Sequence, residues 1–175
     1  MTRRDMPLIR EEAPADVEAV RGVLRAAFAR EAESRLVERL HAAAKATISL
    51  VAEEHGRILG YVLFSPVSID TGKTQQPAFA LAPLAVTPAF QRLGIGSALV
   101  SAGLARLCEQ RAERVLVLGD PGYYARFGFV PASRFLVKSS FPVPDEAFMA
   151  MELVPGAFSG CSGVARYGHE FDDLE

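Results

Sequence analysis

The sequence has few cysteines, little excess charge and no long apolar run. Its 175 residues include two cysteines, Cys108 and Cys161, and no CxxC pair. A structural zinc site needs more ligands at closer spacing, so we expect no metal site and free thiols in a reducing compartment. The formal net charge of -2 lacks the basic excess of nucleic-acid-binding proteins. We therefore expect no nucleic-acid partner.

Two further absences concern location. The N-terminal stretch MTRRDMPLIREEAP has no apolar core of the kind that signal peptides carry. No apolar run approaches the roughly 18 residues that a membrane-spanning helix needs. These observations favour a cytoplasmic protein without a membrane partner.

Half of the residues are hydrophobic, which is enough to bury a sizeable core. The apolar periodicity predicts the order α-α-β-β-β-α-β-α-β-β, a single α/β (α+β) domain. Helices are expected over residues 14–28, 34–44 and 94–110, with a short one from 120. Strands are expected over 47–52, 58–65, 78–86 and 114–119, and in FLVKSSF and AFMAMELV. Residues 66–77 are expected to form a polar connection, and residues from 155 onward a loop or loose extension.

Pro83 interrupts the apolar run at 78–86. Proline has no N–H to donate to a sheet, so it indicates an edge, a bulge or a place where strand pairing stops. The run then leads directly into the stretch QRLGIGSALV at 91–100.

Gly94 and Gly96 stand where this stretch turns into a helix, with Arg92 just before them. The first turn of a helix presents unpaired N–H groups, and glycines allow a ligand to approach the backbone closely. This combination binds phosphate groups. The motif is neither GxGxxG, because Leu99 occupies the third glycine position, nor a P-loop, because it lacks GK[ST]. Taken alone, the two glycines equally fit a turn that only serves helix packing.

Two motifs together resemble a known family. Residues 91–96 match Q/R-x-x-G-x-G/A, and Tyr124, Gly128 and Phe129 match Y-x-x-x-G-F. Both are features of the GNAT family of acyl-CoA-dependent N-acetyltransferases, which the chain resembles over residues 7–154, leaving 155–175 as a C-terminal tail. GDPGYYARFGF and PDEAFMAMEL further resemble a bacterial branch of that family, the YhbS type.

The resemblance implies the GNAT fold, a mixed and mostly antiparallel sheet flanked by helices, with splayed central strands. It also implies direct attack of a primary amine on acetyl-CoA, which is a cosubstrate, without a metal. The backbone of three strand residues would pair with the pantetheine arm, and the glycine turn would hold the diphosphate. The cofactor-binding residues so implied are Leu84, Ala85, Val86, Gln91, Arg92, Leu93, Gly94, Ile95, Gly96 and Ser97. The first three can also be read as ordinary buried strand residues.

The resemblance assigns Tyr124 the role of a catalytic proton or hydrogen-bond donor to the leaving thiolate. The alternative is a tyrosine that packs its ring inward. The run 78–86 contains no carboxylate to serve as general base. Glu33 could reach the acceptor and bind an ammonium, or it could be a solvated glutamate at a helix end. His41 and His55 are expected at the surface, and Asp120 is explained as a helix cap.

The leading functional hypothesis is an N-acetyltransferase acting on a small-molecule amine or a protein amine. A non-catalytic acyl-CoA sensor on the same fold is the alternative that the missing carboxylate leaves open. A nucleotide-binding oxidoreductase is disfavoured, because the third glycine and a later acidic residue are absent. A homodimer through the C-terminal strands is compatible with the sequence.

Overall fold

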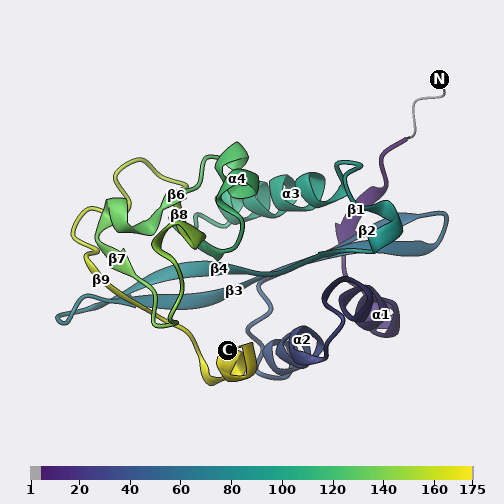
Figure 1. The fold of residues 1–175 in the computed structure, drawn as a ribbon, viewed down its shortest axis with the longest axis horizontal. Coiled ribbons are helices and arrows are strands. Elements are labelled where there is room, and N and C mark those ends of the chain that lie inside the picture. Colours follow the sequence, from purple (N-terminus) through teal and green to yellow (C-terminus); the bar gives the residue numbers. More distant parts are fainter. Residues whose placement is uncertain (1–4, 175) are drawn as a thin grey trace. The chain divides into compact units, whose positions relative to one another are not determined.

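The computed structural model describes residues 5–174, and these form two compact units. The first unit comprises the residues up to Leu63 together with Pro83–Arg106. The second comprises Phe64–Ala82 and the residues from Leu107 onward. Strands β3 (Arg57–Asp70) and β4 (Gln75–Val86) contribute to both units (Figure 1).

The first unit has helices on both faces of its strands. β1 (Leu8–Glu11) pairs antiparallel with β2 (Ile48–Glu54), from Leu8↔Glu53 to Glu11↔Leu50. Helices α1 (Val17–Phe28) and α2 (Ala32–Ala42) lie on one face, and the start of α3 (Ile95–Glu109) lies on the other (Figure 1). A layer of strands between helices is the expected way to bury the apolar side of each element.

Neighbouring residues of β3 show how the two faces differ. A Cβ at Gly60 would lie 2.9 Å from Leu99 Cδ1 and 3.2 Å from Ile95 Cγ2, so glycine permits the close approach of α3. Tyr61 points to the opposite face, as alternation along a strand requires, and its hydroxyl contacts Ser49 Oγ at 2.8 Å. The α1–α2 side and the α3 side of β3 are therefore separate environments.

The ends of the first helices follow from local chemistry. Pro14–Asp16 form a 3₁₀ turn in which Asp16 Oδ2 accepts hydrogen bonds from Ala13 N and Arg10 Nη1, each at 2.7 Å. Ala29 ends α1 in the left-handed conformation at φ 53°. The apolar periodicity that predicts a helix over residues 14–28 corresponds to a buried face with Val20 and Leu24, whereas Val17 is 44% exposed.

The second unit contains the mixed part of the sheet. β4 and β5 (Arg114–Leu118) run parallel, from Phe79↔Val115 to Leu81↔Val117. β8 (Phe148–Glu152) pairs antiparallel with β5 and with β6 (Val130–Pro131). β9 (Gly163–Arg166) pairs antiparallel with β3 and parallel with β7 (Val137–Lys138). The predicted α/β class with a mixed, mostly antiparallel sheet is confirmed.

The predicted polar connection over residues 66–77 is wrong. β3 continues to Asp70 and β4 begins at Gln75, so the connection is a short turn. Asp70 Oδ1 accepts from Gly72 N at 2.9 Å, and Thr71 Oγ1 accepts from Thr74 N at 3.0 Å. These side-chain bonds close the turn locally and let both strands extend.

Two C-terminal expectations also need correction. The strand expected in FLVKSSF is only β7, because residues Ala132–Phe135 form a 3₁₀ helix and Leu136 adopts φ 59°. The segment after Pro155 is not loose, because β9 pairs with two strands and Phe158 and Phe171 are buried. Local polarity and glycine content concealed a segment whose apolar side chains are covered by residues far away in the sequence.

Two further features concern membrane-spanning helices and groups of metal-binding side chains. Within residues 5–174, no helix has the length and apolar character that a membrane crossing demands. The same part of the chain contains no group of three or more His, Cys, Asp or Glu arranged to hold a metal ion.

Candidate active site

The glycine turn of the first unit is an exposed loop that is tied back to β4. After a 3₁₀ turn at Pro88–Phe90, Gln91 Nε2 donates to Val86 O at 3.0 Å. Arg92 and Gly94 adopt left-handed conformations, with φ of 61° and 86°. Positive φ in two of three successive residues turns the chain sharply between the end of β4 and the start of α3.

The N-terminus of α3 presents its backbone amides at this turn. Ala98 N donates to Gly94 O at 3.0 Å, which makes Gly94 the residue that caps the helix. The preceding amides, including those of Gly96 and Ser97, have no carbonyl one turn earlier to bond, and the helix dipole adds positive character there. Arg92 and Leu93 are exposed, whereas Ile95 is buried and anchors the helix. The turn therefore has the chemistry of an anion site.

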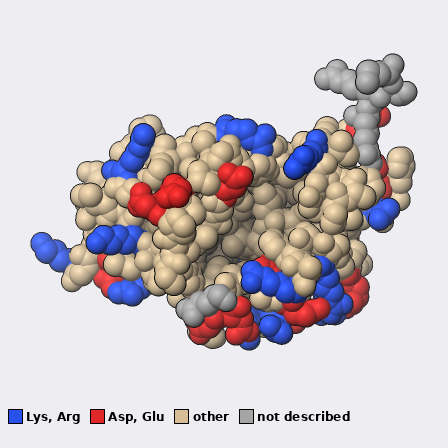
Figure 2. Space-filling view, in the orientation of Figure 1, with Lys and Arg blue, Asp and Glu red and all other residues tan. Residues whose placement is uncertain are grey.

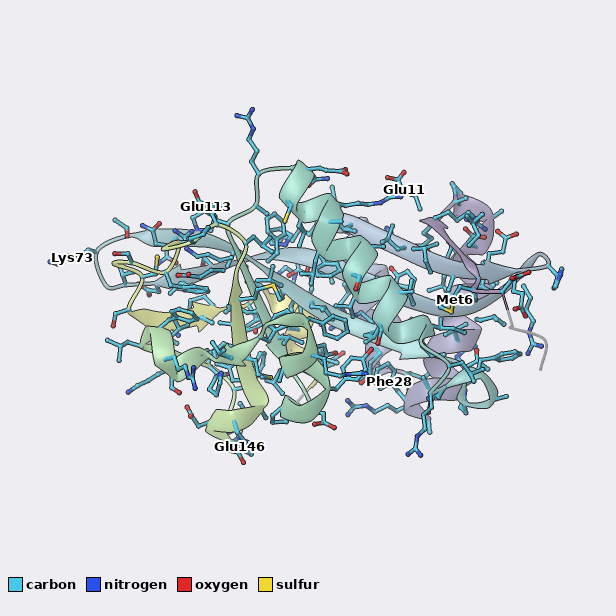
Figure 3. All side chains as sticks on the ribbon, turned by 90° about the horizontal axis from the view of Figure 1, so that it is seen from above. Met6, Glu11, Phe28, Lys73, Glu113 and Glu146 are labelled. Atoms are coloured by element: carbon cyan, nitrogen blue, oxygen red, sulfur yellow. The ribbon has the colours of Figure 1, made fainter. Side chains whose placement is uncertain are left out.

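Met6, whose side chain is labelled in Figure 3, approaches the turn from outside it. Its Cε lies 3.9 Å from the position that a Cβ at Gly94 would take. This is ordinary van der Waals contact, so the need for glycine at 94 is conformational rather than steric.

The last residues of β4 continue beyond its pairing with β5. The parallel register runs as far as Leu81↔Val117, and Pro83 follows two residues later. The expectation that pairing stops near Pro83 is consistent with this register. Ala85 is buried, while Leu84 and Val86 are half-buried. The Val86 carbonyl already accepts the hydrogen bond from Gln91, so Gln91 helps to position the turn.

Tyr124 lies in the second unit at the end of α4 (Pro121–Tyr124). Asp120 caps this helix by accepting from Gly122 N at 2.8 Å, and Gly128 ends the following 3₁₀ turn at φ 104°. The helix cap expected at Asp120 is confirmed. The chain here is held by short-range bonds on both sides of the tyrosine.

The ring of Tyr124 is packed among aromatic side chains. It makes edge contacts with Tyr123 and Phe129 at centroid distances of 5.0 and 5.8 Å, and the residue is 8% exposed. Burial, with smaller contributions from Tyr123 and Asp120, raises the pKa of the Tyr124 phenol well above its ordinary value. The phenol is therefore neutral over the whole physiological range and retains its proton for donation.

Glu33 is buried, so it is not the solvated glutamate that one of the two sequence interpretations expects. Its side chain is 5% exposed in the first turn of α2, and Arg30 Nε donates to its Oε1 at 2.9 Å and its Oε2 at 3.1 Å. The two oxygens are thus both occupied by one guanidinium. An ammonium would have to compete with Arg30 for this carboxylate.

A polar cluster in the first unit escaped sequence analysis. Glu12 Oε2 accepts from His41 Nε2 at 2.9 Å and from Tyr61 OH at 3.2 Å, and it also bonds Ser49 Oγ. Glu12 directly follows β1, and its three partners come from α2, β2 and β3. No local spacing in the sequence relates them, so only the folded chain reveals the cluster.

The hydrogen bonds of this cluster shift the pKa values of Glu12 and His41 in opposite directions. Burial opposes the charge on Glu12, but hydrogen bonds from His41 and Ser49 outweigh it and hold the pKa of Glu12 below its ordinary value. The hydrogen bond to Glu12 raises the pKa of His41 against the effect of burial. His41 is 42% exposed, so the surface position expected for it is confirmed, but its ring is engaged by Glu12.

Comparisons with known proteins establish the family of this chain. The sequence profile of the family described as Acetyltransferase (GNAT) domain matches residues 8–132. This chain belongs to the GNAT family. The predicted resemblance is therefore confirmed, and the family activity is transfer of an acyl group to an amine.

Relatives match over almost the whole chain. A protein of Escherichia coli K12 named uncharacterized N-acetyltransferase YhbS is 36% identical over 166 residues, which cover 94% of this chain and 98% of that protein. The crystal structure of E. coli YhbS in complex with CoA has a TM-score of 0.90 at 34% identity, over 98% of this chain and 96% of the other. A GNAT acetyltransferase of Brucella melitensis in complex with acetyl-CoA has a TM-score of 0.79 at 36% identity, over 97% of this chain and all (100%) of the other. The YhbS-type branch expected from the sequence is confirmed.

Proposed function

We propose that this GNAT chain transfers the acetyl group of acetyl-CoA to a primary amine by direct attack. The observation that carries the proposal is the exposed turn from Gln91 to Gly94 that opens α3. Family membership and the CoA and acetyl-CoA complexes of two relatives support the same ligand. An anionic diphosphate is the group that such a helix start recognises best.

The coenzyme is bound through backbone groups of the first unit in this proposal. Amides from Arg92 to Ser97 hold the diphosphate, and the end of β4, at Leu84, Ala85 and Val86, pairs with the amides of the pantetheine arm. Gln91 keeps the turn fixed to β4 through its bond to the Val86 carbonyl. Leu93, which is 45% exposed, offers an apolar contact to the coenzyme.

The reaction needs proton movements at two atoms. The neutral amine attacks the thioester carbonyl, its C–N bond forms, and the C–S bond breaks to release the CoA thiolate. The amine nitrogen loses one proton and the thiolate sulfur gains one, so no redox partner is required. A backbone N–H near Leu84–Val86 would stabilise the oxyanion of the tetrahedral intermediate.

Tyr124 donates a hydrogen bond to the leaving thiolate in this scheme. Its raised pKa makes complete proton transfer to a thiolate uphill, because a thiol has a pKa near 8.5. The role of the phenol is therefore stabilisation of the developing negative charge on sulfur. The amine proton leaves through solvent water, since β4 carries no carboxylate and Glu33 is engaged by Arg30.

The acceptor is a small-molecule amine or a protein amine, and we place the reaction in the cytoplasm. The occupied Glu33 and the lack of a strand carboxylate favour a second candidate function, a non-catalytic acyl-CoA sensor. Release of free CoA thiol in the presence of a panel of amines separates the two. Turnover with any amine supports the transferase, whereas tight coenzyme binding without turnover supports the sensor.

The decisive experiment is calorimetric titration of CoA and acetyl-CoA into the wild type and Gly96→Glu. The new carboxylate would stand at the proposed diphosphate site and abolish binding by charge repulsion. Gly22→Glu is the matched control, because a Cβ at Gly22 meets nothing within 4 Å on the exposed side of α1. Equal affinity of wild type and a folded Gly96→Glu would refute the diphosphate assignment.

A further inference from the structure

Most basic side chains of the first unit are engaged by acidic ones. Arg21 donates to Glu38 and Glu18, each at 2.6 Å, and Arg106 donates to Glu11 at 2.6 Å. Acidic and basic side chains accordingly intermingle over α1 and α2 (Figure 2). Further interactions engage Arg10, Arg25, Arg30, Arg35, Arg39 and Lys45.

Arg57 and Arg92 are the exceptions in this unit. Both residues are exposed, and within residues 5–174 neither side chain forms an ion pair or a hydrogen bond. Glu53, which precedes the same turn as Arg57, is occupied by Arg10 at 2.6 Å. An exposed guanidinium without an acidic partner has all five of its N–H donors available to a ligand.

The two unpaired arginines belong to the surroundings of the glycine turn. Arg92 lies within the turn, and the Arg57 Cζ lies 5.3 Å from the centroid of the Phe90 ring, two residues before Arg92. Thr87 N donates to Leu59 O at 2.9 Å, which holds the segment leading into the turn beside the start of β3. Positive charge that no carboxylate compensates is therefore gathered near the amides that open α3.

Phe90 restrains Arg57 without using its hydrogen-bond donors. The attraction between a cation and an aromatic ring favours positions of the guanidinium near the ring, and it leaves the N–H groups unbonded. A planar guanidinium held in this way loses less freedom when it binds an oxyanion in a bidentate manner. Arg57 is thus prepared for a phosphate.

The coenzyme carries a second anionic group in addition to its diphosphate. In the proposed function the diphosphate occupies the backbone amides of the turn, and the ribose of CoA bears a separate phosphate monoester on its 3′ carbon. A phosphate monoester has a charge of about −1.5 to −2 at neutral pH and three oxygens that accept hydrogen bonds. Two unpaired guanidinium groups are complementary to such a group in charge and in donors.

We propose that Arg57 and Arg92 bind the 3′-phosphate of the coenzyme and make the site selective for CoA over dephospho-CoA. The inference rests on the proposed function, because that function places the diphosphate at the glycine turn. It adds a ligand contact from β3, an element outside the two sequence motifs that resemble the family.

The test is calorimetric titration of CoA and dephospho-CoA, which differ only in the 3′-phosphate. Each ligand is titrated into the wild type, Arg57→Gln, Arg92→Gln and the variant with both substitutions. The measured quantity is the ratio of the two dissociation constants, because a change in the shared diphosphate contacts alters both constants equally. Arg25→Gln is the matched control, since it removes the same charge from α1, where Arg25 pairs with Glu31.

The wild type is expected to bind CoA about tenfold more tightly than dephospho-CoA, as expected for a charge-assisted hydrogen bond. Each single substitution should lower this ratio by about threefold, and the variant with both substitutions should bind the two ligands equally. Arg25→Gln should keep the ratio of the wild type.

A ratio that survives in the variant with both substitutions would overturn the inference, and so would an equal fall of the ratio in Arg25→Gln. A wild type that binds both ligands equally would overturn this inference alone. If the wild type bound neither ligand, the proposed function would be refuted, and this inference with it.

Discussion

Gly119 lies so close to the ring of Tyr124 that no larger residue fits at position 119 without displacing the ring. A Cβ at position 119 would lie 2.5 Å from Tyr124 Cε2 and 3.1 Å from Cδ2. The glycine directly follows β5, and its N–H is held by Ala147 O at 2.9 Å. The backbone at Gly119 therefore sets where the tyrosine ring can lie.

Gly119→Ala should displace the Tyr124 ring and lower turnover more than it lowers coenzyme affinity. The backbone hydrogen bond resists movement of residue 119, so the ring must shift, and overpacking of this kind costs about 1–3 kcal/mol of stability. Steady-state kinetics and thermal unfolding measure both effects. Gly22→Ala, at an open helical position, should leave turnover unchanged and slightly stabilise the protein. Unchanged kcat in Gly119→Ala would contradict the positioning argument.

Tyr124→Phe should lower kcat by about 10²-fold while the affinity for CoA stays the same, because only the hydrogen bond to the thiolate is lost. Tyr123→Phe is the neighbouring control, since the Tyr123 ring is engaged by Arg126 at 4.4 Å. Its kcat should remain near that of the wild type. Equal losses in both variants would assign Tyr124 to packing alone.

Gly60→Ala should weaken coenzyme binding from within the core of the first unit. The added methyl would meet Leu99 Cδ1 at 2.9 Å and the Ala85 carbonyl oxygen at 3.2 Å, so α3 must move away from β3 and the end of β4 is crowded as well. Stability should fall by about 1–3 kcal/mol. Chemical denaturation and calorimetry with CoA test this, and a variant with wild-type CoA affinity would show that the turn tolerates such a shift.

The Glu12–His41 pair predicts a defined pH dependence of stability. The pKa of Glu12 is lowered on folding, so its contribution is present above its ordinary pKa near 4.5 and is lost as the pH falls through the folded value. The pKa of His41 is raised, so its contribution is complete below its ordinary pKa near 6.5 and is lost as the pH rises through the folded value. The pair should therefore stabilise the fold most between about pH 4.5 and 6.5.

His41→Gln should remove the part of this profile above about pH 6.5. Urea unfolding across the pH range measures it, with His55→Gln as a control because His55 is an exposed turn residue. If both variants kept the same slope as the wild type above neutrality, the pair would not be coupled to folding.

The sequence by itself determined the features that depend on a few neighbouring residues. The glycine turn, the Asp120 cap and the left-handed Gly128 follow from the backbone preferences of those residues. The motifs around them were sufficient to identify the family. The helices were located to within a few residues because the apolar period of each is a local property.

Only the tertiary structure decided which distant side chains meet. Glu12 joins residues 29, 37 and 49 positions away, and no local period encodes such separations. The Arg30–Glu33 pair is local, but the burial of Glu33 is a tertiary effect that its position at a helix end did not indicate. Likewise, the pairing of β9 with β3 could not be predicted from the glycine-containing segment in which β9 lies. Burial and long-range pairing are properties of the assembled chain, because their free energy comes from surfaces that meet only after folding.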